Sequence, residues 1–219
     1  MHAQRIFEGV YRIGRKLATV NYDKGKKVYN EELFKINDVE YRSWNPYRSK
    51  LAAAILNGLK TLAIKKSSNV LYLGAATGTT ASHVSDIVDD GNVFCVELSE
   101  RNMRELIRVC ERRPNMLPIL CDANETERYM TDVGKCDIIY QDISAKEQAE
   151  IMNKNRVMLK KGGYAYFIIK SQSIDISSKP SEIFKSELAK LSPEFEIVEQ
   201  IDIEPYDSMH LFVVLRNKA

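Results

Sequence analysis

The chain has 219 residues, of which 44% are hydrophobic, so it can form one domain with a sizeable core plus a small appendage. Its formal net charge is only +2, and the excess of Lys and Arg lies at the front, where residues 1–50 hold 11 against 6 acidic residues. So small a surplus excludes a chain that binds a polyanion tightly by charge alone, although the basic front would suit contact with one.

Cysteine usage and hydropathy indicate the cellular compartment that we expect for the protein. The four cysteines form no C-x-x-C pair, and Cys95 and Cys121 lie within apolar runs, so we expect reduced, buried thiols and no metal site. No apolar stretch approaches the roughly 18 residues of a membrane-spanning helix, and the first residues lack a signal-peptide pattern. We therefore expect a cytoplasmic protein.

Residues 1–43 are predicted to form a small β-sheet domain, and residues 44–219 the main domain. The first part holds short β-branched and aromatic runs at 6–13, 17–20, 27–29 and 39–42, separated by turn-forming residues. Its aromatic side chains could stack on nucleobases, but packing is favoured because so small a sheet needs apolar cover. These aromatics are Phe7, Tyr11, Tyr22 and Tyr29.

A short helix is predicted directly after the β-sheet domain. Pro46 prevents a helix from starting earlier, and Ser49 can cap the alanine-rich run that follows it. Lys50 then lies in the first turn, where a cation opposes the helix dipole. A surface lysine is the simple explanation, and a functional one is the alternative.

From residue 67 onward, strand-like and helix-like segments alternate, which predicts a doubly wound parallel α/β sheet. Strands are expected at 70–73, 93–96, 117–121, 137–141, 164–169, 195–203 and 210–216, with helices near 79–89, 99–112, 124–131, 145–159 and 180–191. The connection 204–209 is too short for a crossover helix, so the last strand must run antiparallel. Seven strands with the last antiparallel are typical of the Rossmann-like class I S-adenosylmethionine-dependent methyltransferase fold.

The turn after the first of these strands has the small residues of a nucleotide site. Gly74, Ala76 and Gly78 precede a helix, so a ligand can approach the backbone and the N–H groups of that helix. The spacing does not match the G-x-G-x-x-G of dinucleotide binders, which argues against a nicotinamide dehydrogenase. Glu97, 23 positions after Gly74, can accept hydrogen bonds from a ribose diol. Asp122 can bond the amine at the adenine edge, and Ala123 leaves room for the ring. Each feature alone would fit an ordinary turn, but together they favour S-adenosylmethionine.

Four polar residues are expected at the carboxyl edge of this sheet, above the methyl group of that cofactor. Asp142 and Lys170 follow two parallel strands, His210 begins the antiparallel one, and Lys50 can join from the preceding helix. Methyl transfer to a hydroxyl needs an in-line approach and removal of the hydroxyl proton. We assign Lys170 as base or as orienter of the hydroxyl, Asp142 and Lys50 as positioning partners, and His210 as the member that fixes the network.

These motifs together resemble the fibrillarin family, in its archaeal form, over almost the whole chain. The residues that carry the resemblance are Trp44-Asn45-Pro46-Tyr47-Arg48-Ser49-Lys50-Leu51-Ala52-Ala53, Tyr72-Leu73-Gly74-Ala75-Ala76-Thr77-Gly78-Thr79-Thr80, Val96-Glu97, Cys121-Asp122-Ala123 and Tyr140-Gln141-Asp142. The glycine- and arginine-rich extension of eukaryotic members is absent. The chain departs from the family at Met209, where an acidic residue often precedes the histidine, and after Asp142, where a proline is usual.

The resemblance implies a catalytic tetrad at the same four residues, Lys50, Asp142, Lys170 and His210. It also implies cofactor contacts beyond the turn residues Gly74 and Ala76, at Thr79, Thr80, Glu97, Leu98, Asp122, Ala123, Asp142, Ile143, Ser144 and Ala145. The implied activity is methylation of ribose 2′-hydroxyls in ribosomal and transfer RNA. A box C/D guide RNA chooses the site, a Nop-family scaffold protein holds the enzyme on it, and a kink-turn-binding protein joins through the scaffold.

Two other functions remain as alternatives. The first is a catalytically silent RNA-binding assembly protein on a methyltransferase fold, which the intact tetrad argues against. The second is an RNA base methyltransferase. Such an enzyme commonly has an aromatic, proline-containing clamp after the fourth strand, and residues 141–144 contain neither residue type.

Overall fold

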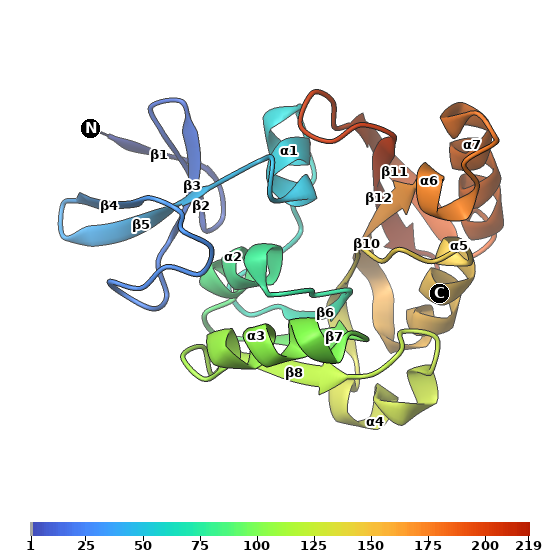
Figure 1. Ribbon diagram of the computed structural model, residues 1–219, viewed down its shortest axis with the longest axis horizontal. Coiled ribbons are helices and arrows are strands. Elements are labelled where there is room, and N and C mark those ends of the chain that lie inside the picture. Colours follow the sequence, from blue (N-terminus) through green and yellow to red (C-terminus); the bar gives the residue numbers. More distant parts are fainter. Residues whose placement is uncertain (1) are drawn as a thin grey trace.

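The computed structural model describes residues 2–219 as two β-sheets with flanking helices. The N-terminal sheet is antiparallel, with strand order β1-β2-β3-β5-β4. Figure 1 shows it in blue at one end of the molecule, connected through α1 to the rest. Its strands are β1 (Ala3–Phe7), β2 (Val10–Ile13), β3 (Lys16–Val20), β4 (Leu33–Ile36) and β5 (Val39–Trp44), and α1 is Lys50–Leu56.

Two expectations for this sheet are wrong. The run 6–13 is interrupted by a turn at residues 8–9 and forms parts of two strands rather than one. The run 27–29 is not a strand, because the Glu31 carboxylate accepts hydrogen bonds from the backbone N–H groups of Val28 and Tyr29. Those N–H groups therefore cannot join a ladder, and Leu33–Ile36 pairs with β5 instead.

The main sheet has seven strands in the order β11-β12-β10-β9-β6-β7-β8. Only β12 runs antiparallel, between β10 and β11, so the predicted class I methyltransferase sheet is confirmed. The strands are β6 (Asn69–Leu73), β7 (Asn92–Glu97), β8 (Met116–Leu120), β9 (Cys136–Gln141), β10 (Leu159–Lys170), β11 (Phe195–Asp202) and β12 (His210–Asn217).

Helices cover both faces of the main sheet. Side chains alternate along each central strand: Val70 and Tyr72 of β6 pack with α1, α2 and α3, whereas Leu71 and Leu73 pack with α4, α5 and α7. No helix within residues 2–219 is long and apolar enough to cross a membrane. The remaining helices are α2 (Thr79–Ile87), α3 (Glu100–Cys110), α4 (Met130–Val133), α5 (Gln148–Asn155), α6 (Ser171–Ile174) and α7 (Pro180–Leu191), with short 3-10 turns at Thr126–Arg128 and Arg156–Met158.

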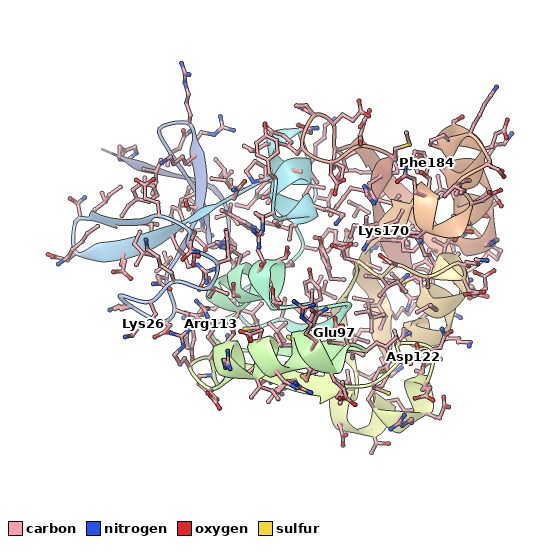
Figure 2. The ribbon with its side chains drawn as sticks, viewed as in Figure 1. Lys26, Glu97, Arg113, Asp122, Lys170 and Phe184 are labelled. Atoms are coloured by element: carbon pink, nitrogen blue, oxygen red, sulfur yellow. The ribbon has the colours of Figure 1, made fainter. Side chains whose placement is uncertain are left out.

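A cluster of buried polar side chains joins the N-terminal sheet to α2 and α3. We call it the interface cluster, and it consists of Thr19, Arg42, His83, Asp86 and Arg113. The Asp86 carboxylate lies between the two guanidinium groups, with Arg113 Nη1 at 2.7 Å and Arg42 Nη1 at 3.5 Å. Arg42 comes from β5 and Arg113 follows α3 (Figure 2), so this carboxylate ties together segments that are distant in sequence.

Hydrogen bonds fix the protonation of His83 inside this cluster. The Thr19 hydroxyl donates to Asp86 Oδ2 at 2.6 Å, so it must accept the proton of His83 Nδ1 at 2.8 Å. Nε2 is then the acceptor, and the Tyr29 hydroxyl lies 2.7 Å from it. Burial, together with the charges of Arg42 and Arg113, lowers the pKa of His83 well below its usual value. The imidazole is therefore neutral in the folded protein.

Candidate active site

The carboxyl edge of the main sheet brings the four predicted catalytic residues together. Lys50 is the first residue of α1, and the hydroxyl of Ser49 accepts from the backbone N–H of Ala52, as its capping role predicts. Asp142 directly follows β9, and Lys170 and His210 are opposite residues on the paired strands β10 and β12. Side chains at opposite positions of an antiparallel pair stand on the same face of the sheet.

Asp142 is shared by two lysines. Its Oδ1 lies 2.8 Å from Lys170 Nζ, and its Oδ2 lies 3.2 Å from Lys50 Nζ. Lys170 Nζ also donates to the backbone carbonyl of Asp142 at 3.1 Å and to the Ser144 hydroxyl at 3.2 Å. The three charged side chains are between 13% and 19% exposed, so the group is largely buried but open to a ligand on one side.

A fifth residue, Asp207, links His210 to this group. Asp207 Oδ1 lies 2.7 Å from His210 Nδ1, and Asp207 Oδ2 lies 3.5 Å from Lys50 Nζ. No sequence pattern predicts Asp207, and its only signal is its place in the short connection between β11 and β12, three residues before His210. The five side chains form one continuous chain of contacts, which we call the active-edge network: Lys170, Asp142, Lys50, Asp207 and His210.

The electrostatics of the network keep Asp142 ionised. Burial raises the pKa of its carboxyl, but the nearby ammonium groups of Lys50 and Lys170 outweigh that effect, and the pKa lies below its ordinary value. The site therefore presents a permanent negative charge between two cations. Such a charge can attract a cationic sulfonium, while the ammonium groups supply hydrogen-bond donors for a hydroxyl.

A cavity of about 630 Å³ opens beside this network. Figure 2 shows three of its residues, Glu97, Asp122 and Lys170, arranged around the same part of the carboxyl edge. Predicted cofactor residues that line the cavity are Gly74, Ala76, Glu97, Leu98, Asp122, Ala123, Asp142, Ile143, Ser144 and Ala145. Lining residues that the sequence did not indicate are Val96, Ser99, Asn102, Cys121, Asn124 and Ile151.

Thr79 and Thr80, which are also predicted to contact the cofactor, are not among the residues that line this cavity. Thr79 begins α2, and the buried hydroxyl of Thr80 donates to Ser49 at 3.0 Å. Thr80 therefore supports the start of α1, where Lys50 lies.

The floor of the cavity depends on Gly74. This residue has φ of +83°, and a Cβ added there would lie 2.6 Å from the carbonyl oxygen of Asp142 and 2.9 Å from a methyl group of Ile143. A side chain would thus displace the segment that carries Asp142. The same segment is held by Gln148, whose amide accepts from Lys170 N and donates to Ala145 O. Residues 143–147 are therefore a loop, and α5 begins at 148 rather than at the expected 145.

Two carboxylates, those of Glu97 and Asp122, line the cavity. Glu97 ends β7, and its oxygens accept from the backbone N–H groups of Ala76 and Ser99, both at 2.8 Å. Asp122 lies two residues after β8, and its Oδ1 accepts a hydrogen bond from the backbone N–H of Asn124 at 2.8 Å. Hydrogen bonds hold both carboxylates in place and leave acceptor capacity for a ligand. This donor and acceptor set fits S-adenosylmethionine.

Comparisons with known proteins show which family the chain is similar to. The sequence matches the family described as Fibrillarin over residues 1–219. A fibrillarin-like rRNA/tRNA 2′-O-methyltransferase from Methanocaldococcus jannaschii is 48% identical over 218 residues, covering 96% of this chain and 95% of the relative. Aeropyrum pernix fibrillarin in complex with natively bound S-adenosyl-L-methionine superposes with a TM-score of 0.90 at 40% identity, covering 98% of each chain.

A second solved structure, of a fibrillarin/Nop5p complex, superposes with a TM-score of 0.91 at 38% identity and covers 98% of this chain and all of that one. The match to the family extends over the full length of the sequence, and these relatives share both sheets of the fold. The chain therefore belongs to the fibrillarin family.

Proposed function

We propose that this chain transfers the methyl group of S-adenosylmethionine to ribose 2′-hydroxyls of ribosomal and transfer RNA. Fibrillarins are S-adenosylmethionine-dependent methyltransferases, and the chain is such an enzyme. The observation that carries the proposal is the pair of ion contacts from Lys50 and Lys170 to Asp142, at the mouth of a cavity that fits the cofactor.

Different cavity residues are assigned to different parts of the cofactor. We assign Glu97, at the end of β7, as the acceptor for the ribose diol, and Asp122 as the acceptor for the adenine amine, because both line the cavity. Gly74 keeps the backbone close enough for the ligand to lie against it. When bound, the cofactor supplies an electrophilic methyl group on a positively charged sulfur, which the ionised Asp142 carboxylate stabilises nearby.

The active-edge network then orients the hydroxyl that is methylated. Lys170 and Lys50 hold their ammonium groups on opposite oxygens of Asp142, so both donors have fixed positions. A hydroxyl oxygen that accepts from one of them is held against the methyl carbon. Fixing two reacting atoms in line accounts for much of the acceleration of such a transfer.

We propose further that a box C/D guide RNA chooses the nucleotide, that a Nop-family scaffold protein holds the enzyme, and that a kink-turn-binding protein joins through the scaffold. Support comes from the related fibrillarin that forms a complex with Nop5p. The small net charge of +2 also supports a delivered substrate, because a chain that bound RNA tightly by itself would be far more basic.

The test is transfer of labelled methyl from S-adenosylmethionine in a reconstituted guide complex. Two target RNAs are compared, which differ only in a ribose or a 2′-deoxyribose at the guided nucleotide. We expect label in the ribose RNA and none in the deoxyribose RNA. Equal label in both would indicate a base methyltransferase. Absence of label in both, with cofactor binding intact, would indicate a silent assembly protein.

A further inference from the structure

The hydrogen bonds of Lys170 describe a protonated amine. Its Nζ lies within donor distance of three acceptor oxygens: Oδ1 of Asp142, the carbonyl of Asp142 and the hydroxyl of Ser144. The Lys170 ammonium donates to the carbonyl and to the Ser144 hydroxyl and forms an ion pair with Oδ1, which leaves one N–H for a ligand hydroxyl. Because the carboxylate and carbonyl oxygens of Asp142 can only accept, they favour the protonated amine. Lys170 is therefore arranged as a fixed cation and not as the base that removes the hydroxyl proton.

The hydrogen bond of His210 indicates, in contrast, an imidazole with a lone pair free to accept a proton. The Asp207 carboxylate is an acceptor, so the proton between Asp207 Oδ1 and His210 Nδ1, 2.7 Å apart, belongs to the imidazole. With that proton on Nδ1, a neutral ring carries its lone pair on Nε2. Within the described residues 2–219, Nε2 has no hydrogen-bond partner, and the side chain is 21% exposed.

The strand register places this imidazole beside the Lys170 ammonium. Lys170 and His210 are opposite residues on β10 and β12, so their side chains stand next to each other on one face. Asp207 is held on its other side by Lys50, 3.5 Å from Oδ2. One carboxylate thus touches two members of the tetrad, and the orientation of the imidazole follows from it.

We propose that Asp207 is a positioning residue that holds His210 with its proton on Nδ1, and that His210 Nε2 is the base for the ribose 2′-hydroxyl. The inference rests on the proposed function and deepens it. As the hydroxyl oxygen forms its bond to the methyl carbon, the carbon–sulfur bond breaks and its electron pair stays on sulfur. The hydroxyl proton passes to Nε2, and the resulting imidazolium faces the Asp207 carboxylate until it loses the proton to water.

The first test reads the tautomer directly. The chain has only three histidines, so ring nitrogen signals of a protein labelled with ¹⁵N-histidine can be assigned with His210→Asn. At mildly alkaline pH we expect the wild-type His210 proton on Nδ1. In Asp207→Ala, which removes the acceptor, we expect the population to move toward the Nε2-protonated form. A wild-type proton on Nε2 would overturn the proposal, whether or not the enzyme methylates ribose.

The second test is kinetic, in the guide complex with cofactor binding measured in parallel. We expect Asp207→Ala to lower kcat by about 10²-fold. We expect its affinity for S-adenosylmethionine and its melting temperature to stay close to wild type. Asp207→Asn, whose amide oxygen can still accept a hydrogen bond from His210 Nδ1, should show a smaller decrease in kcat than Asp207→Ala. The matched control is Asp202→Ala, at the end of β11, an exposed aspartate whose carboxylate accepts from the backbone N–H of Glu204.

The two readouts separate this inference from a structural role for Asp207. If Asp207→Ala keeps kcat within about twofold of wild type, His210 does not depend on Asp207 and the proposal fails. If kcat, cofactor affinity and melting temperature fall together, Asp207 is structural and the proposal also fails. Lys170→Arg sharpens the choice, because an arginine keeps the charge but cannot act as a base. Residual transfer in that variant supports His210, whereas complete loss with normal cofactor binding supports Lys170 as the base.

Discussion

The interface cluster and the active-edge network are built on the same pattern, a single aspartate held between two cations. Asp86 lies between Arg42 and Arg113, and Asp142 lies between Lys50 and Lys170. The difference lies in burial and in the type of cation. The ionised side chains around Asp86 are at most 1% exposed, whereas those around Asp142 are between 13% and 19% exposed.

This difference indicates how one charge pattern serves two purposes. Arginine offers five donors in a rigid plane, and at the interface these donors reach fixed protein partners such as Ser82 and Ser85. Lysine is a compact charge on a flexible stem, and at the active edge it leaves one side open to a ligand. The first arrangement should therefore govern stability, and the second should govern activity.

The largest expected effect comes from removing the aspartate of the interface cluster. Asp86→Ala leaves the buried Arg113 guanidinium without a carboxylate and Arg42 with Glu31 alone, 3.0 Å from its Nε. Breaking a buried ion pair in this way costs about 3–5 kcal/mol of unfolding free energy. Urea unfolding followed by circular dichroism measures the loss. Asp142→Asn is the comparison, and we expect it to lose much less stability. Equal losses in the two variants would contradict the division between stability and activity.

Lys170→Ala should have the reverse profile. We expect a loss of about 10²- to 10³-fold in kcat, or about 3–4 kcal/mol of barrier, because the fixed cation beside the hydroxyl is gone. Affinity for S-adenosylmethionine, measured by calorimetry, should stay within a few-fold of wild type. Lys190→Ala is the matched control, since Lys190 also pairs with carboxylates but on α7, away from the cavity. Lost cofactor binding in Lys170→Ala would instead make Lys170 a cofactor ligand.

A glycine pair tests whether the active edge depends on backbone shape as well as on charge. Gly74 and Gly58 both have positive φ, but only at Gly74 would a Cβ meet neighbouring atoms, 2.6 Å from the carbonyl of Asp142. We expect Gly74→Ala to cost about 1–3 kcal/mol more than Gly58→Ala and to weaken cofactor binding. Thermal unfolding and cofactor titration of both variants measure this. Similar losses in the two variants would mean that backbone strain alone, and not the contact with Asp142, sets the effect.

The sequence was sufficient for the features that depend on local periodicity and on strand ends. Lys50, Asp142 and Lys170 were predicted because polar residues after parallel strands, or at the start of a following helix, meet at one edge. Asp207 was not predicted, because its role comes from a side chain reaching back across a short connection to β12. Such contacts depend on side-chain rotamers and produce no periodic pattern in the sequence.

The interface cluster escaped prediction for a related reason. Arg42 lies in β5 of the N-terminal sheet, and Asp86 lies in α2, which packs on the main sheet. Nothing in the local sequence around either residue distinguishes it from a surface charge. The strand expected at 27–29 failed similarly, because the Glu31 carboxylate takes the N–H groups that a ladder would need. In both places a non-local or side-chain interaction overrides local propensity.

The smallest expected effect is the pH dependence that His83 gives the interface cluster. Burial and the flanking arginines lower the pKa of His83 well below 6.5 in the folded protein, whereas the unfolded chain titrates it near the ordinary value. As pH falls below about 6.5, the unfolded state binds a proton that the folded state does not. The contribution of His83 is thus fully present above that pH, and stability declines by up to about 1.4 kcal/mol per pH unit below it.

The active-edge carboxylate does not obscure this window. The pKa of Asp142 is lowered below 3.8, so its own contribution is lost only at more acidic pH. Urea unfolding at several pH values between about 5 and 7 should therefore give a steeper decline for wild type than for His83→Gln. Gln lacks the titrating ring but retains a donor and an acceptor for Thr19 and Tyr29. Parallel declines in the two proteins would mean that the folded cluster accepts the proton on His83 despite its burial and the charges of Arg42 and Arg113.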